Sequence, residues 1–295
     1  TADVIFVNGW DLEEGLASDI ETIAADSDAV VVPISANVPP LAFGDHADEE
    51  HADEEHADEE HADEEHADEE HADEEHADEE HADEEHADEE HADEEHADEE
   101  HADEEHADEE HHHEGADPHV WFAVHNVETW AENTAVVLSA LNPDQAETFT
   151  ANAEAYTAVL ESLEAELAAQ IASIPESNRK MVTNHDAFAY FAEEYGFEVV
   201  GTVIPSRSTL SEPSAQDLAG LIETMRRENL CVIFTETTVS DRLAETVAGE
   251  LGDCTAVEIV QLYTGALGEP GSGIDSYVAF MRTNVASIVG ALGTP

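Results

Sequence analysis

The sequence is very poor in basic side chains. Seven lysines and arginines stand against 75 aspartates and glutamates, and Lys180 is the only lysine in the chain. A surface that binds nucleic acid needs a basic stripe, which this composition does not supply, so we exclude that class of function. Concentrated salt screens repulsion between carboxylates over short distances, so the acidic composition is typical of a protein from a halophilic source.

The sequence also lacks a long apolar run and a leader at its start. No run reaches the roughly 18 apolar residues that span a bilayer, and no charged segment followed by an apolar one opens the chain. Residues 1–10 instead read as a strand that already enters a turn. We therefore expect a further segment before Thr1 in the full protein, with any membrane anchor in that segment.

Only two cysteines are present, and both stand at the start of apolar segments. Cys231 opens C-V-I-F-T-E, Cys254 precedes T-A-V-E-I-V, and a helical stretch lies between them. If the two segments are neighbouring parallel strands, both cysteines lie at the same edge of the sheet and can form a disulfide. Such a bridge would contribute about 3 kcal/mol and would indicate an oxidising compartment. Two buried thiols are the alternative.

A low-complexity block interrupts the chain. The pentapeptide H-A-D-E-E runs thirteen times from His46 to Glu110 and holds 39 of the acidic residues. Alanine is its only apolar residue, so the block cannot bury enough surface to offset the entropy of ordering it. We expect residues 46–114 to form a disordered loop. The rest of the chain is close to half apolar, which is enough for one or two packed cores.

Sixteen of the 19 histidines lie in this loop. Neutral imidazole is the commonest protein ligand of metals such as zinc, and the neighbouring carboxylates are harder, weaker partners for that ion. A spacing of five residues defines no tetrahedral set, so we expect many weak, exchanging zinc sites. A merely solvating acidic segment is the alternative. The candidate loop ligands are His46, His51, His56, His61, His66, His71, His76, His81, His86, His91, His96, His101, His106, His111, His112 and His113.

Outside the loop, segments that read as strands alternate with segments that read as helices. This alternation predicts mostly parallel sheets covered by helices on both faces. A helix of about 30 residues, roughly 45 Å long, follows Pro143 and continues to Pro175. We predict an α/β protein with two lobes joined by a long rigid helix. The predicted parts are an N-terminal lobe (1–45 with 115–141), the loop (46–114), the linking helix (142–175) and a C-terminal lobe (176–295).

The first lobe is expected to contain strands at 3–7 and 29–34 around a helix at 11–25, with a further helix that ends near Asn142. The second lobe is expected to contain four strands and four helices. The strands are expected at 180–184, 197–203, 231–235 and 256–262, and the helices at 186–195, 214–228, 240–251 and 274–292.

Three histidines remain outside the loop, and two of them stand at junctions between elements. His119 comes just before a helix in D-P-H-V-W, and His185 follows a strand in M-V-T-N-H. Ligands of open α/β folds bind in the crevice at the carboxyl ends of the strands. A single histidine there is more often a helix cap or a core residue. One histidine from each lobe favours a shared metal site.

Five segments, in this order, resemble the zinc and manganese substrate-binding proteins of ABC importers: N-G-W-D-L-E, D-P-H-V-W, N-H-D-A-F-A-Y-F-A-E-E-Y-G, E-P-S-A-Q-D-L and L-G-E-P-G-S-G-I-D-S-Y. The resemblance covers nearly all of the chain outside the repeat, and D-P-H-x-W with N-H-D-A-F is its most specific part. It implies two α/β lobes bridged by a long helix and an extracytoplasmic, membrane-anchored protein. The His-rich insert before D-P-H is similar to that of the family's zinc members.

Carried over by position, the resemblance implies that His119 and His185 are metal ligands. The family's first ligand, a histidine before N-G-W, has no counterpart in this sequence, and its aspartate falls on Gly265. Water or another carboxylate would then complete the site. Glu236 in F-T-E is the weak candidate, and a supporting or helix-capping role is its alternative. His125 matches no ligand and is expected at the surface. A histidine at the third ligand position favours Zn²⁺ over Mn²⁺, which prefers oxygen ligands.

The resulting prediction is a monomeric, non-enzymatic receptor that captures Zn²⁺ between its lobes and delivers it to the permease of an ABC importer. The loop would collect ions beside the cleft. A metal buffer or adhesin of the same fold is the main alternative, and the absence of permease and ATPase genes beside its own would indicate it. A zinc hydrolase is less consistent with the sequence, which has no H-E-x-x-H, no nucleophile elbow and no glycine-rich phosphate loop.

Overall fold

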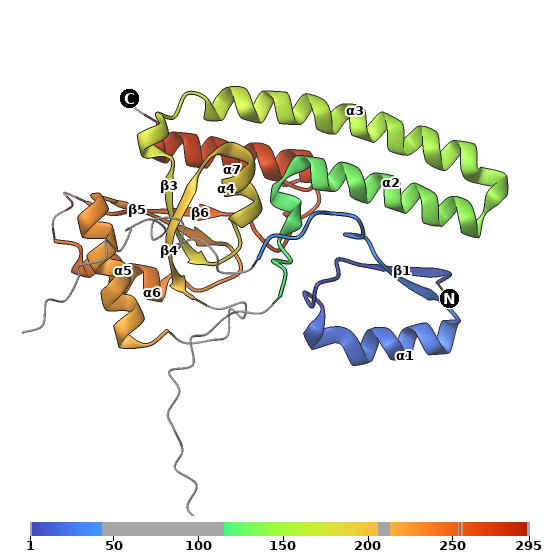
Figure 1. Cartoon of the computed structure of the whole chain (residues 1–295), viewed down its shortest axis with the longest axis horizontal. Helices are drawn as coiled ribbons and strands as arrows, with labels where there is room; N and C mark the ends of the chain where they lie inside the picture. The colour runs from blue at the N-terminus through green and yellow to red at the C-terminus, as the bar shows by residue number, and fades with distance from the viewer. Residues whose placement is uncertain (1, 43–114, 206–212, 253, 255, 294–295) are drawn as a thin grey trace, which may run out of the picture. The chain divides into compact units, whose positions relative to one another are not determined.

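The computed structural model describes residues 2–42, 115–205, 213–252, 254 and 256–293 (Figure 1). The described residues before and after the repeat belong to one compact unit. The predicted disordered loop and its sixteen histidines lie outside the described residues, so both stay predictions. Among the described helices, none is both long enough and apolar enough to cross a membrane.

The chain begins with two parallel strands and a crossover helix. β1 (Val4–Val7) pairs with β2 (Val30–Pro33) along their whole length. A short 3₁₀ turn, η1 (Glu14–Leu16), and α1 (Ala17–Ser27) connect the two strands. This is the predicted strand, helix and strand. The strands consist mainly of β-branched residues, which suit the pleated surface of a sheet.

A second sheet has four parallel strands in the order β4-β3-β5-β6. Helices cover both of its faces. Adjacent residues of a strand point to opposite faces of the sheet, and Met181 and Val182 on β3 belong to two different clusters of buried residues. The strands are β3 (Lys180–His185), β4 (Glu198–Ile204), β5 (Val232–Glu236) and β6 (Glu258–Leu262). The helices are α4 (Ala189–Tyr195), α5 (Ala215–Glu228), α6 (Arg242–Glu250) and α7 (Tyr277–Leu292).

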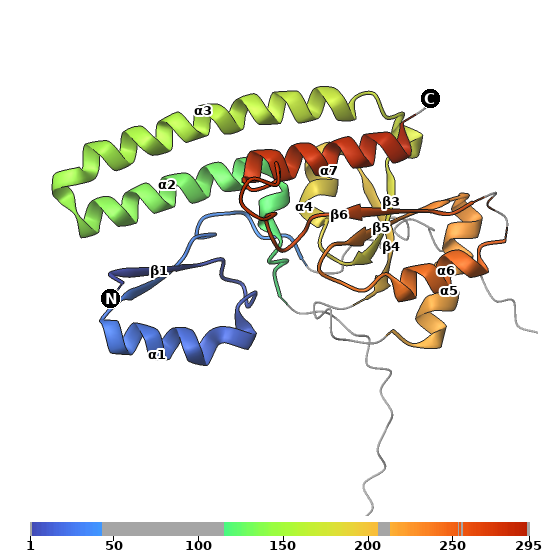
Figure 2. The ribbon, with the colours of Figure 1, turned by 180° about the vertical axis from the view of Figure 1, so that it is seen from behind.

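In the sequence, the segment between the two sheets forms a pair of long helices. α2 (Val124–Leu141) and α3 (Ala146–Ile171) run antiparallel and side by side, and α7 lies along α3 (Figures 1 and 2). A 3₁₀ turn, η3 (Pro143–Gln145), reverses the chain between them, with the proline at a first-turn position. The 26 residues of α3 extend for about 39 Å. The long helix of the prediction is therefore present.

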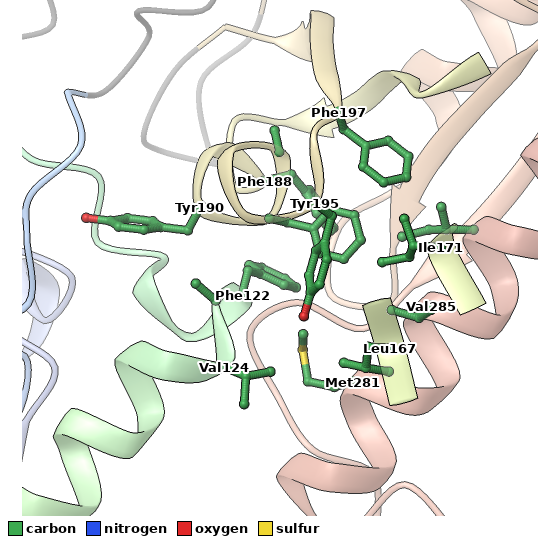
Figure 3. Packing of buried hydrophobic residues seen from close by; sticks show 14 of the residues in the cluster. Phe122, Val124, Leu167, Ile171, Phe188, Tyr190, Tyr195, Phe197, Met281 and Val285 are labelled. Atoms are coloured by element: carbon green, nitrogen blue, oxygen red, sulfur yellow. The ribbon is translucent and has the colours of Figure 1, made fainter. Parts of the chain in front are cut away.

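The main hydrophobic core lies where α3, α4 and α7 meet the sheet. Figure 3 shows Phe122, Phe188, Leu167 and Met281 among the side chains of this cluster. The rings of Phe122 and Phe188 have centroids 4.5 Å apart. All four side chains are at most 1% exposed. This packing holds the segment around Phe122, which directly follows D-P-H-V-W, against the segment that follows β3.

The predicted α/β fold class is confirmed, while several helix boundaries differ from the predicted ones. α4 begins at Ala189 rather than at residue 186, because the backbone bends at residue 186 and residues 187–188 are not yet helical. α7 begins at Tyr277 rather than at 274, since the hydroxyl of Ser276 accepts the backbone N–H of Ala279 and caps the helix there. α1 is preceded by a 3₁₀ turn and starts at Ala17. The proposed division into lobes stays a prediction.

The structure joins Cys231 and Cys254 in a disulfide. Their Cα atoms are 5.8 Å apart. Cys231 directly precedes β5, Cys254 lies before β6, and these two strands pair in parallel from Val232 with Glu258. The two sulfur atoms therefore meet at the amino-terminal edge of the sheet, opposite the edge at which β3 ends with His185.

Candidate metal centre

His119 lies in the loop before a short 3₁₀ turn, η2 (Val120–Phe122), and is 7% exposed. The carboxylate of Asp117 holds it at two points. One oxygen, Oδ1, accepts the backbone N–H of His119 at 2.9 Å and contacts ring atom Nδ1 at 2.6 Å. A carboxylate in this position accepts a hydrogen bond from Nδ1–H, which keeps the proton on Nδ1 and leaves the lone pair on Nε2 free to bind a metal ion.

His185 is the last residue of β3 and is 4% exposed. Its Nδ1 atom contacts Oε1 of Glu236, the last residue of β5, which is 2% exposed. The register explains this pairing. Thr183 lies opposite Phe234 on the neighbouring parallel strand, so His185 and Glu236, each two residues further on, share one face of the sheet. The lone pair of His185 Nε2 is thereby left free, as it is in His119.

The two histidines face each other through their free nitrogen atoms. Nε2 of His119 and Nε2 of His185 are 3.4 Å apart, and the ring planes are inclined by 71°. Two zinc–nitrogen bonds of about 2.0–2.1 Å at a tetrahedral angle hold their nitrogens about 3.3–3.4 Å apart. The spacing of the two Nε2 atoms is therefore that of two ligands on one tetrahedral ion.

Glu236 supports His185 from the side away from His119. Its second oxygen, Oε2, accepts the hydroxyl of Thr264 at 2.5 Å, so both oxygens have partners. Among the described residues, no group of three or more His, Cys, Asp or Glu side chains has a geometry suited to one shared metal ion. In this arrangement Glu236 orients a histidine. Its predicted role as a direct ligand stays a prediction.

Two other positions named from the sequence are His125 and Gly265. His125, in the first turn of α2, is exposed, and its Nδ1 lies 2.9 Å from a carboxylate oxygen of Glu194 on α4. Gly265 is exposed, and a Cβ built on it has no atom within 4 Å. This position, which the resemblance assigns to an aspartate, therefore presents open space beside Thr264.

Sequence reasoning did not assign a role to three residues that the structure places around the histidines. They are Asp117, Trp121 and Thr264. The indole of Trp121 lies edge-on to His119 with ring centroids 5.4 Å apart, and its N–H donates to the carbonyl of Thr264 at 3.0 Å. Asp117 stands in D-P-H itself, so its position two residues before a predicted ligand was the available signal. The roles of Trp121 and Thr264 depend on contacts between distant segments.

An apolar cavity of about 320 Å³ adjoins the centre, and Trp121, Thr264 and Gly265 are among its lining residues. Tyr277, at the start of α7, also lines it. Its hydroxyl donates to the carbonyl of Trp121 at 2.8 Å. Burial raises the pKa of this hydroxyl well above its usual range, so Tyr277 stays protonated and keeps donating at neutral pH.

Comparisons with known proteins identify the family and the fold. A family model described as zinc-uptake complex component A, periplasmic (ZnuA), matches residues 1–291. The manganese-binding lipoprotein MntA of Halalkalibacterium halodurans is 36% identical over 179 residues, which are 61% of this chain and 58% of that protein. The zinc-binding protein TroA of Treponema pallidum is 34% identical over 181 residues, which are 60% of this chain and 57% of that protein. The chain thus spans less than three fifths of the length of these relatives.

The solved structure of the periplasmic zinc-binding protein TroA from Treponema pallidum is similar to this structure. The TM-score is 0.67, and the match covers 99% of this chain and 82% of that one. The sequence identity over this match is 24%, so the likeness concerns the fold. It is the same α/β architecture of parallel sheets and a long helix that the described residues form.

Proposed function

Because the chain belongs to the family of zinc-uptake complex component A, a family of solute-binding proteins and not of enzymes, we propose that it is the metal-binding component of an ABC importer. In this role it binds a divalent metal ion outside the cytoplasm and delivers it to a membrane permease. The observation that carries the proposal is the 3.4 Å separation of the two Nε2 atoms, which suits two ligands of one ion.

We propose Zn²⁺ as the preferred ion. Relatives of this chain are named for manganese as well as for zinc, so the choice depends on the donor atoms. Two imidazole nitrogens suit zinc, a borderline-soft ion, better than manganese, which prefers carboxylate, carbonyl and water oxygens. In addition, the open space at Gly265 offers no carboxylate oxygen at the position where the resemblance implies one.

The buried carboxylates of Asp117 and Glu236 have two effects in this proposal. Each accepts a hydrogen bond from the Nδ1 atom of one histidine, which selects the tautomer with a free Nε2 and raises the basicity of that nitrogen. Together they also place two negative charges next to a doubly charged ion. A buried cation is costly unless it is compensated in this way.

The remaining coordination positions would be filled by water or by donors outside the described residues. The histidines of the loop, from His46 to His113, would collect zinc at weak sites and raise its local concentration near the centre. The disulfide between Cys231 and Cys254 accords with an oxidising, extracytoplasmic compartment. These points extend the proposal and have tests of their own in the Discussion.

A zinc titration read by tryptophan emission tests the site in the full chain. The repeat contains no tryptophan, whereas the ring of Trp121 lies 5.4 Å from that of His119, so the emission reports on the centre rather than on the loop. A competing chelator, added throughout, removes zinc from weak sites. His119→Ala and His185→Ala should each weaken binding by more than about 100-fold, beyond the 10–100-fold loss for residues that only support a ligand.

The matched control is His125→Ala, which removes an exposed histidine that also contacts a carboxylate. This variant should bind zinc like the unaltered chain. A parallel titration with Mn²⁺ tests the choice of metal, and zinc should bind at least tenfold more tightly. If His119→Ala or His185→Ala retains full zinc affinity, the proposed site is wrong. If manganese binds as tightly as zinc, the proposed selectivity is wrong.

A further inference from the structure

The two histidines are linked by a closed circuit of contacts through Thr264. On one side, His119 contacts Trp121, whose indole N–H donates to the carbonyl of Thr264. On the other side, the hydroxyl of Thr264 donates to Glu236, which contacts His185. The two Nε2 atoms close it at 3.4 Å. We propose that Thr264 is the positioning residue that sets the separation of these atoms, an inference that rests on the metal-binding function proposed above.

The hydroxyl of Thr264 controls the side of the centre that contains His185. Thr264 is 3% exposed, and Glu236 is 2% exposed. The hydroxyl donates to Oε2 at 2.5 Å, which holds the carboxylate plane so that Oε1 meets Nδ1 of His185. Without this donor, Oε2 would be a buried carboxylate oxygen with no hydrogen-bond partner among the residues that the structure describes. Because such an atom is strongly unfavourable, the carboxylate would turn and release His185.

The backbone of Thr264 controls the side that contains His119. Its carbonyl accepts the indole N–H of Trp121, which lies in η2, two residues after His119. The hydroxyl of Tyr277 donates to the carbonyl of Trp121 and holds the same residue from α7. One residue, through two different groups, therefore contacts the supports of both histidines.

A buried asparagine on α7 fixes the backbone next to Thr264. The side chain of Asn284, which is 2% exposed, accepts the backbone N–H of Tyr263 at 2.9 Å and donates to its carbonyl at 2.7 Å. Both backbone groups of the residue before Thr264 are thus held by one amide. The segment after β6 is accordingly rigid where it meets Glu236, as a residue that positions ligands requires.

The chain offers a matched control one residue from Glu236. Thr235 is 0% exposed, like Thr264 it is a buried threonine, and its Oγ1 has no hydrogen-bond partner among the described residues. Successive side chains of a strand point to opposite faces, so Thr235 lies on the face of the sheet away from His185 and Glu236. Replacing its hydroxyl by a methyl group therefore removes no hydrogen bond to the part of the chain that the structure describes.

The experiment compares Thr264→Val, Thr264→Ser and Thr235→Val in the full chain. Zinc affinity is measured by tryptophan emission with a competing chelator, and unfolding of the metal-free protein is followed alongside. Thr264→Val should weaken zinc binding by about tenfold, the lower end of the range for residues that support a ligand. Thr264→Ser, which keeps the hydroxyl, should restore affinity to within about threefold, and Thr235→Val should leave affinity unchanged.

A double variant separates positioning from a general loss of structure. If Thr264 acts through Glu236, then Thr264→Val should weaken zinc binding far less in a chain that already carries Glu236→Gln, because the two changes interrupt one pathway. Equal losses in both backgrounds, unchanged affinity in Thr264→Val, or no recovery with serine would each overturn the inference. In all these cases His119→Ala and His185→Ala would still abolish tight binding. If those two variants keep it, the proposed function itself has failed.

Discussion

If zinc binds as proposed, Asp117 is expected to be as important for zinc binding as many direct ligands, although it would act on the ion only through His119. Its buried Oδ1 atom accepts from both the backbone N–H and the Nδ1 atom of His119, at 2.9 and 2.6 Å. Asp117→Asn keeps the size of the side chain. It removes the negative charge, and its amide group can present N–H₂ instead of oxygen to the imidazole, which disfavours the tautomer with a free Nε2.

The expected loss follows from this contact. Removal of a carboxylate that supports a metal-bound histidine lowers metal affinity by about 10–100-fold, which corresponds to about 1.4–2.8 kcal/mol. Asp117→Ala should also destabilise the metal-free protein by about 1–3 kcal/mol, because the buried backbone N–H of His119 then loses its acceptor. Zinc affinity is read by tryptophan emission, and stability by denaturant unfolding without metal.

Glu194→Gln is the matched control for this prediction. The Glu194 carboxylate also contacts Nδ1 of a histidine, His125, but that histidine is exposed on α2. The control should leave zinc affinity unchanged within about twofold, because exposed pairs of this kind contribute little. If Asp117→Asn and Glu194→Gln have the same small effect, the reasoning that a buried carboxylate orients the metal-binding histidine is refuted.

Three further predictions concern other parts of the chain. Calorimetric titration of the full chain should detect, besides the proposed centre, several weak zinc sites that disappear when residues 46–113 are deleted and that are lost below about pH 6, because protonated imidazole does not ligate. Weak sites that persist after the deletion, or weak binding that is unchanged at pH 5, would contradict this. Thiol labelling of the denatured, unreduced protein should find neither Cys231 nor Cys254 free, and reduction should lower the free energy of unfolding by about 3 kcal/mol; labelling of both would disprove the bridge. Burial raises the pKa of the Glu164 carboxyl, against the opposing effect of the hydrogen bond from Tyr195. The folded protein therefore holds that proton more tightly than the unfolded chain, and it loses stability as pH rises through the raised pKa. Glu164→Gln should stabilise the protein on the order of 0.5 kcal/mol at pH 7 and should not stabilise it at pH 3. An equal gain at both pH values would count against this cause.

The sequence was informative about elements and poorly informative about their ends. Alternating segments predict the parallel sheets of an α/β fold, and the apolar spacing after Pro143 predicts the long helix α3. The start of α4 was placed three residues too early, at 186 instead of Ala189. Local pattern does not reveal that the backbone bends directly after His185 before the helix begins.

The two histidines of the candidate site could be named from the sequence, whereas the residues that contact and orient them could not. His119 and His185 stand beside recognisable motifs at element junctions, and the structure brings their Nε2 atoms together. Glu236 was a weak candidate as a ligand, and only the register of β3 against β5 shows that it meets the Nδ1 side of His185. Thr264 had no signal, because its role depends on hydrogen bonds to residues 28 and 143 positions away.

A crystal structure of the zinc-loaded protein, with anomalous scattering measured at the zinc absorption edge, tests the central claim most directly. The account predicts a zinc peak between His119 and His185, at about 2.0–2.1 Å from each Nε2 atom. The Nδ1 atoms should remain hydrogen-bonded to Asp117 and Glu236. A zinc ion bound through Nδ1, or a fully loaded protein with no zinc between these two histidines, would contradict the account.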